Sequence, residues 1–276
     1  MNEAGVKRVL LGVGIAFMLI FSLGPFAWML LVSASRNPDF LSPTSRFSAT
    51  MANYADILTV RSLHFLDYLR NSLAVGAIVA AASSLVAAAA AYAVSRIDFR
   101  GRLALSLGIL AFSMFPQISL VGYLYKLMRA CGLINTYAAL VLPYMAWTLP
   151  LAFWIMLSYL TRIPRDFDDA ARADGAGRFT VFRKVILPIA APGLLSAMLL
   201  VFIAAFNEFL FALMLTTDHA ARTVPVGIAL FEGLHGEIPW GYIMAASTLA
   251  SLPLVALAMV FQRYVIQDVT RGALKG

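Results

Sequence analysis

The sequence predicts an all-α membrane protein with six transmembrane helices. Hydrophobic residues make up 61% of its 276 residues, and charged residues make up only 13%, about half the ~25% that soluble domains carry. Six stretches of at least 23 residues contain no Asp, Glu, Lys or Arg: 9–35, 71–95, 103–125, 130–161, 185–207 and 238–262. A membrane-spanning helix needs about 20 mainly apolar residues, so buried helices of a soluble protein are a poor explanation.

We treat residues 1–276 as one transmembrane domain, with spans at about 9–35, 71–95, 103–125, 137–161, 189–216 and 239–262. The first span is too long for the apolar core of a signal peptide, so it is expected to be retained. The second is rich in Ala, Ser and Gly, which let helices approach closely in lipid, so it is expected inside the bundle.

Prolines interrupt the third and fourth spans, at Phe115–Gln117 and at Pro143 and Pro150. Proline in a spanning helix frees backbone carbonyls, which is tolerated where protein or a water-filled cavity satisfies them. Each proline therefore indicates either such a site or a simple packing kink, and the sequence leaves both readings open.

Lys and Arg are distributed unequally between the two sides of the predicted bundle. If the N-terminus is cytoplasmic, 14 of them fall on the cytoplasmic side and 7 fall outside. Cytoplasmic loops carry an excess of Lys and Arg, so both termini and the segment 162–188 are expected in the cytoplasm. The net charge of +7 then reflects topology, and no nucleic-acid partner is expected.

The sequence offers little for catalysis. Its single cysteine, Cys131, excludes an internal disulfide and a multi-cysteine metal site, and no metal site is expected. No nucleophile–base pair of the kind that covalent catalysis needs is apparent inside the spans. The chain is therefore not expected to be an enzyme.

The segment 162–188 interrupts the apolar chain with charged residues in a pattern that predicts two short helices. Pro164 suits a helix start, and three aspartates follow where a helix's positive end favours acids. Gly175 and Gly177 are expected to end this first helix. FTVFRKVIL is expected to form the second helix, pinned to the bundle by Phe179 and Phe182 and broken at Leu187–Pro188. An amphipathic helix lying on lipid headgroups is the alternative.

The spacing within this segment resembles a known motif. The segment contains, in order, Asp169-Ala170-Ala171, three residues, Gly175, nine residues, Val185, one residue and Leu187-Pro188. This pattern matches the EAA loop of ABC-importer permeases. Asp169 replaces the family's Glu and Val185 replaces its Ile, and both changes keep the chemical type. Five further stretches are similar to the carbohydrate branch of that family, the maltose- and trehalose-type permeases. They are NS at 71–72, GLINTYAALVLPY at 132–144, FNEFLFAL at 206–213, IPWGYIMAAS at 238–247 and the tail RGALKG.

The resemblance implies a role and a set of partners. In that family the EAA loop is a coupling helix that sits in a cleft of a cytoplasmic ATPase, so Asp169, Ala170, Ala171, Gly175, Leu187 and Pro188 become candidate ATPase-coupling residues, and the tail 271–276 is implied to reach the ATPase dimer. The chain has no phosphate-binding G-x-x-x-x-G-K-[ST] loop. It therefore needs no cofactor of its own, and ATP and Mg²⁺ would bind to the ATPase dimer.

The further implied partners are a second, homologous permease, an extracytoplasmic sugar-binding protein and the lipid of a bacterial or archaeal cytoplasmic (inner) membrane, which the chain would cross several times. Together these predict a translocation subunit of an ATP-driven sugar importer. A secondary, ion-coupled transporter is the alternative, but it would typically show broken repeat helices and ionisable residues for its coupling ions.

Glu208 is the one acid within a predicted span, which makes it a functional candidate. With Asn207 it could bind sugar hydroxyls; equally, it could clasp the partner permease or a neighbouring helix. Gln117, Tyr144 and Trp147 are weaker candidates for the substrate pathway, since an aromatic face with a polar handle suits a sugar ring. No Lys or Arg lies in mid-membrane, which favours a neutral sugar unless the other permease supplies a positive charge.

Overall fold

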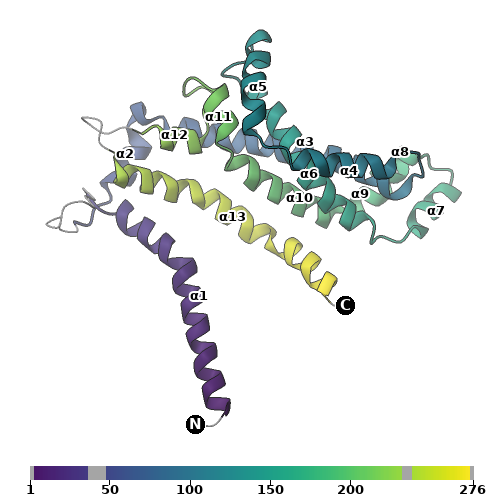
Figure 1. Cartoon of the computed structure of the whole chain (residues 1–276), viewed down its shortest axis with the longest axis horizontal. Coiled ribbons are helices and arrows are strands. Elements are labelled where there is room, and N and C mark those ends of the chain that lie inside the picture. Colours follow the sequence, from purple (N-terminus) through teal and green to yellow (C-terminus); the bar gives the residue numbers. More distant parts are fainter. Residues whose placement is uncertain (1–2, 37–47, 232–237, 274–276) are drawn as a thin grey trace. The chain divides into compact units, whose positions relative to one another are not determined.

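Helices make up the protein in the computed structural model, which describes residues 3–36, 48–231 and 238–273 (Figure 1). Within those ranges there is no strand, only a bridge between Ser35 and Ala49. Four helices there are long and apolar enough to cross a membrane, and two bent helix pairs raise the number to six if each pair forms one span. The predicted all-α membrane fold is therefore confirmed. Residues 274–276 of the predicted ATPase-contacting tail lie outside the described residues.

The chain divides into two compact units. The first comprises Met1–Phe65 and Ile228–Leu252, and the second comprises Leu66–Gly227 and Pro253–Gly276. The first unit contains α1 (Glu3–Ser33), α2 (Ala52–Thr59), the short 3₁₀-helix η1 (Arg61–Leu63) and the start of α13 (Trp240–Ala273). Large apolar side chains of α1 between Leu10 and Leu31 are exposed, as expected of a helix that faces lipid or another chain.

Hydrogen bonds from two polar side chains hold the first unit together. The Asn53 amide of α2 donates to the carbonyl oxygens of Ser33 and Ser35, both at 2.8 Å. The Tyr242 hydroxyl of α13 donates to Asp56 at 2.9 Å. The short helix α2 is therefore joined both to the end of α1 and to the start of α13.

The second unit contains most of the helices. They are α3 (Phe65–Arg96), α4 (Arg102–Ser113), α5 (Ile118–Ala130), α6 (Tyr137–Leu160), α7 (Asp166–Ala173), α8 (Arg178–Val181), the π-helical turn η2 (Phe182–Ile186), α9 (Leu187–Ile189), α10 (Ala191–Phe206), α11 (Leu210–Leu215) and α12 (Val224–Ala229). Helices α6 and α10 pack side by side along their length. A Cβ at Gly193 of α10 would lie 2.5 Å from the Tyr159 ring of α6, so the absence of a side chain there sets their close approach.

The second span, α3, is buried as its small residues predict. Ala87, Ala88 and Ala91 have no exposed surface. Nearer the start of the helix, Gly76 faces the ring of Phe202 on α10, which a Cβ would meet at 3.0 Å. Further along, the Ser83 and Thr148 hydroxyls share a hydrogen bond of 3.1 Å between α3 and α6.

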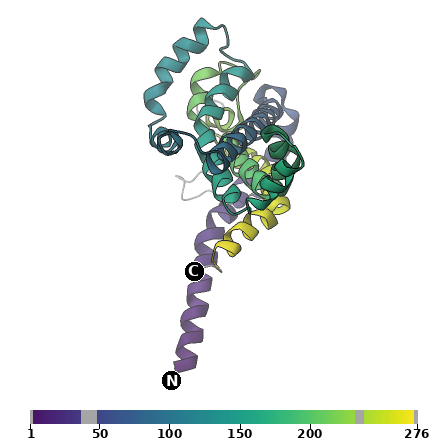
Figure 2. The same cartoon turned by 90° about the vertical axis from the view of Figure 1, so that its right-hand side faces the viewer.

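The third predicted span, 103–125, is not one straight helix. Helices α4 and α5 meet at an angle of 94°, and the bend is visible in Figure 1 and Figure 2. Pro116 lies in the break between them. Proline lacks an N–H and disfavours the helical conformation of the residue before it, so the chain changes direction here.

The fifth predicted span, 189–216, is also interrupted. The expected break at Leu187–Pro188 was wrong, because η2 and α9 continue through it and the chain bends by 78° before α10. Pro192 lies in the first turn of α10, where a missing N–H costs little, whereas Pro188 lies within the run of helical residues that η2 and α9 form. Helix α10 ends at Phe206, and α11 begins at Leu210 after a short break.

Candidate functional site

The segment 162–188 folds as the two short helical pieces that its sequence predicts. Helix α7 carries Asp166, Asp168 and Asp169 in its first turn. At its end Gly175 has a φ of +83°, the left-handed conformation that glycine adopts without steric cost. The Ala176 N–H donates to the carbonyl of Ala171 and the Gly175 N–H to that of Arg172, both at 3.0 Å, which is the Schellman arrangement that closes a helix.

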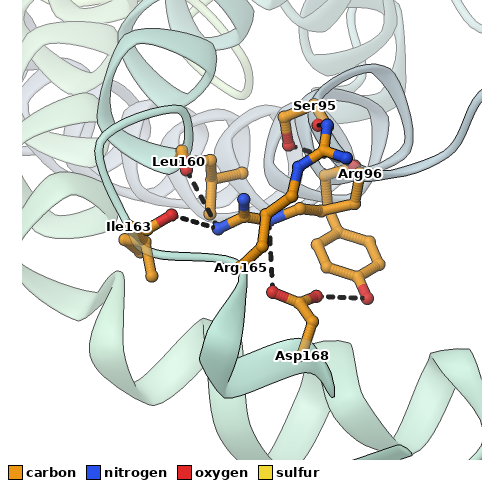
Figure 3. A network of polar contacts seen from close by, with 7 residues as sticks. Ser95, Arg96, Leu160, Ile163, Arg165 and Asp168 are labelled. Atoms are coloured by element: carbon orange, nitrogen blue, oxygen red, sulfur yellow. Dashed lines mark hydrogen bonds and ion pairs between the residues drawn. The ribbon is translucent and has the colours of Figure 1, made fainter.

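A buried ion pair fixes this segment to the end of α3 (Figure 3). The Arg96 Nε lies 3.2 Å from Asp168 Oδ2, and the two side chains expose only 7% and 9% of their surface. The Tyr92 hydroxyl, one turn earlier on α3, donates to Asp168 Oδ1 at 3.1 Å. The Tyr92 ring lies against Phe182 of η2, with centroids 5.1 Å apart. Both pieces of the segment therefore contact the same end of α3.

The guanidinium groups of Arg96 and Arg165 add further hydrogen bonds at the end of α3. Arg96 also donates to the carbonyl oxygens of Leu160 and Ile163, at 3.3 and 2.6 Å, where α6 ends. Arg165 donates in the opposite direction, to the carbonyl of Ser95 at 3.2 Å. Breaking a buried ion pair by removing one partner typically costs about 3–5 kcal/mol, so α7 and the end of α3 are held as one body.

The opposite side of the segment is exposed. Asp169, Ala170, Gly175 and Pro188 are exposed, while Ala171 and Leu187 are half-buried. The expectation that Phe179 pins the second helix was wrong, since 72% of its surface is exposed, whereas Phe182 does pack on α3. With the exposed Phe167 of α7, Phe179 gives this surface two aromatic side chains. Such exposed apolar side chains are typical of a protein-binding surface.

Glu208 lies in the break between α10 and α11. Its carboxylate accepts the Phe211 N–H at 2.8 Å and the Ala212 N–H at 3.2 Å, so it caps α11, and only 5% of its surface is exposed. Tyr144 of α6 is fully buried, with its ring 6.4 Å from that of Phe211, and Glu208 and Thr223 are the polar neighbours of its hydroxyl. The structure thus brings Glu208 and Tyr144 together.

The other pathway candidates lie elsewhere. Asn207 is exposed, and its amide donates to the carbonyl of Ile203 within α10. Gln117 lies at the bend between α4 and α5, and its buried Nε2 has no hydrogen-bond partner among the described residues. Trp147 lines a cavity instead.

This cavity has a volume of about 590 Å³ and lies along one face of α6. Its lining residues are Ser113, Trp147, Thr148, Pro150, Leu151, Trp154, Ile155, Ser158 and Ala204. Trp147, Leu151, Trp154 and Ser158 follow the spacing of four, three and four residues that places side chains on one helix face. The lining combines two tryptophans with three hydroxyls and contains no ionisable side chain.

Of the site residues that the sequence analysis missed, Trp154 could have been found from a sequence pattern and Arg96 could not. Trp154 falls on the same helix face as Trp147, so the helical period alone connects them. Asp168 and Arg96, by contrast, lie 72 residues apart in the chain, and their pairing follows only from the packing of α7 on α3.

Comparisons with known proteins agree with this architecture. Residues 82–271 match the family described as "Binding-protein-dependent transport system inner membrane component". The chain is 53% identical to the trehalose/maltose transport system permease protein MalG of Thermococcus litoralis, over 100% of both chains. It is 40% identical to the trehalose transport system permease protein SugB of Mycobacterium tuberculosis, over 93% of both chains.

A solved structure shares the fold at low sequence identity. It is a chain of a bacterial ABC transporter involved in the import of the acidic polysaccharide alginate, with a TM-score of 0.78 and 19% identity. The match covers 96% of this chain and 98% of that chain.

Replacement of Glu208 tests its role as a helix cap. Glu208→Leu should lower the thermal stability of the purified protein, because each buried N–H left without a partner costs about 1–3 kcal/mol. Glu208→Gln, which keeps one acceptor oxygen, should be less destabilising, and Asn207→Ala should have little effect. An unchanged melting temperature for Glu208→Leu, together with an altered solute dependence of transport, would place Glu208 in the solute path instead.

Proposed function

Because the chain belongs to the family of inner-membrane components of binding-protein-dependent transport systems, we propose that it is the translocation subunit of an ATP-driven importer for a neutral sugar. The observation that carries this proposal is the identity of 53%, along the whole chain, to a trehalose/maltose permease. Trehalose and maltose are therefore the first substrates to test.

The exposed surface of α7 and α8 is proposed to bind a cytoplasmic ATPase dimer, which itself holds ATP and Mg²⁺. Asp169, Ala170 and Ala171 would line the contact, and Gly175 would set the turn between the two helical pieces. Phe179, with 72% of its surface exposed, suits an apolar pocket on the partner, since exposed aromatic side chains are common anchors in protein interfaces. Leu187 and Pro188 would join this surface to the fifth span.

The cavity along α6 is proposed to be part of the sugar pathway. Aromatic rings with nearby polar groups suit a sugar, which has both apolar ring faces and hydroxyls. The lack of ionisable lining residues favours a neutral sugar over an acidic one. A second, homologous permease would complete the pathway, with Asn207 and Gln117 as further candidate polar contacts.

The excess of Lys and Arg on the side that carries the segment 162–188 supports a cytoplasmic location for that segment and for both termini. The opposite side would then face an extracytoplasmic sugar-binding protein. We place the complex in the cytoplasmic membrane of a bacterium or an archaeon, with the chemical step of ATP hydrolysis performed by its partners.

The test is uptake of radiolabelled trehalose and maltose by the complete complex reconstituted in vesicles. Uptake should require ATP, the ATPase and the binding protein, and should be unaffected by collapse of ion gradients. Uptake driven by an ion gradient without the ATPase would instead establish the ion-coupled alternative.

Gly175→Asp should lower ATP-driven uptake per assembled complex by about tenfold. A residue with a Cβ costs about 1–2 kcal/mol in the left-handed conformation, and 1.4 kcal/mol corresponds to a factor of ten. Gly177→Asp is the matched control, because Gly177 has an ordinary φ of −69° and open space around it. Uptake assayed beside ATPase assembly gives the comparison, and equal uptake by the two variants would argue against a role for the Gly175 turn.

Trp147→Ala and Trp154→Ala should each raise the sugar concentration for half-maximal uptake about two- to tenfold. An aromatic contact contributes about 0.5–1.5 kcal/mol, and the loss of one lowers affinity accordingly. Trp154→Phe, which keeps a ring, should behave more like the unaltered complex. The prediction fails if both alanine variants assemble normally and keep the original sugar dependence.

A further inference from the structure

The first turns of α3 organise a loop that lies far from the exposed surface of α7 and α8. The Asn71 amide donates to the carbonyl oxygens of His219 and Arg222, both at 2.9 Å. The neighbouring Ser72 hydroxyl accepts the Val224 N–H at 2.8 Å. Two adjacent residues of α3 therefore hold the chain between α11 and α12, here called the outer segment (residues 216–224). These two residues are the Asn-Ser pair noted in the sequence.

The start of α6 holds the same outer segment. Asn135 accepts the N–H groups of Thr217 and Asp218, and its amide donates to the Asp218 carboxylate at 2.9 Å. That donation, with the N–H of Ala220, keeps the pKa of Asp218 below its ordinary value. The Tyr137 hydroxyl donates to Asn71 Oδ1, which joins the two sets of contacts.

Helix α3 is continuous between this outer segment and the Arg96–Asp168 ion pair. Of the six predicted spans, 71–95 alone contains no proline, and proline is the usual cause of a helix kink. At 1.5 Å per residue, Asn71 and Arg96 lie about 38 Å apart along the helix axis. Gly76 packs on α10 and Ser83 bonds to α6 between these ends.

From this continuity we propose that α3 is a transmission helix, which links the position of the ATPase-facing helix α7 to that of the outer segment. Arg96 and Tyr92 are the positioning residues at one end, and Asn71 and Ser72 are those at the other. A displacement of α7 by the ATPase would then move the outer segment, which we place on the side of the binding protein. The proposal rests on the proposed function only for the identity of the two partners.

The other spans of the second unit are less suited to this role. Helix α6 contains Pro143 and Pro150, and the α4–α5 and α9–α10 pairs bend by 94° and 78°. A bent helix can absorb a displacement at its hinge. Helix α3 combines an unbroken axis with hydrogen-bonded contacts at both ends.

The experiment measures the response of the outer segment when ATP binds to the partner ATPase. Ala220 is replaced by a spin-labelled cysteine in a Cys131→Ser background, and the complete complex is studied with and without ATP under non-hydrolysing conditions. The label should report an ATP-dependent change in mobility or distance in the otherwise unaltered complex. Asp168→Asn and Asn71→Ala should each reduce that change by at least about fivefold, the lower end of typical allosteric coupling.

Two milder variants test the proposal in case Asp168→Asn or Asn71→Ala fails to fold. Tyr92→Phe removes only the hydroxyl and keeps the ring on Phe182, and Ser72→Ala removes only one acceptor; each should give a partial loss of the ATP-dependent change. Asp98→Asn is the matched control, because its ion pair with Arg102 lies just beyond α3 with both side chains exposed. It should leave the signal unchanged.

A double variant separates transmission from two independent local effects. If α3 is a serial link, Asn71→Ala combined with Asp168→Asn should lose no more signal than the worse single variant. An undiminished signal in properly assembled Asp168→Asn or Asn71→Ala, or losses that multiply in the double variant, would overturn the proposal. If the unaltered complex shows the ATP-dependent signal but takes up neither trehalose nor maltose, that result would contradict only the proposed substrate.

Discussion

The ion pair between Arg96 and Asp168 is the constraint on which the rest of the segment 162–188 depends. Each charge lies almost fully buried at the end of a helix bundle, and either charge alone would be costly to bury. Helix α7 therefore cannot separate from the end of α3 unless one of the two charges becomes exposed or stays buried without its partner. The two carbonyls that Arg96 also binds extend the constraint to the end of α6. A charged segment in an apolar chain thus becomes a fixed part of the membrane domain.

Prolines determine where the remaining helices change direction. Pro116 separates α4 from α5, and Pro188 and Pro192 flank the bend between α9 and α10. Inside α6, Pro150 lies among the residues that line the cavity, and a proline there leaves a carbonyl one turn earlier without its helical partner. Backbone polarity within a membrane is tolerated beside protein or water. The irregular helices therefore suit a pathway for a hydrated solute, whereas the proline-free α3 suits the transmission of a displacement along its axis.

The sequence predicted features that depend on local composition, and it missed those that depend on packing. Charge-free windows located the helices, and Pro164, the aspartates that follow it and Gly175 located the helix–turn–helix, because both are short-range patterns. The partner of Asp168 could not be predicted, since many arginines were available and only the fold selects Arg96. Phe179 was misjudged for a related reason: its spacing from Phe182 fits a buried pair, but in the fold Val181 and Ile186 are the buried apolar residues of this piece, and Phe179 lies outside their face.

The geometry of Glu208 bears on the energy source of transport. An acid that couples transport to an ion gradient must bind and release a proton or cation in each cycle. Both Glu208 oxygens accept N–H groups of α11, so protonation would remove acceptor capacity from a buried helix end, and two backbone donors would then compete for fewer lone pairs. Such a carboxylate is suited to a constant structural role. Because Glu208 is the one acid of the predicted spans and is engaged in this way, those spans are poorly equipped to draw energy from an ion gradient, in agreement with the proposed dependence on a partner ATPase.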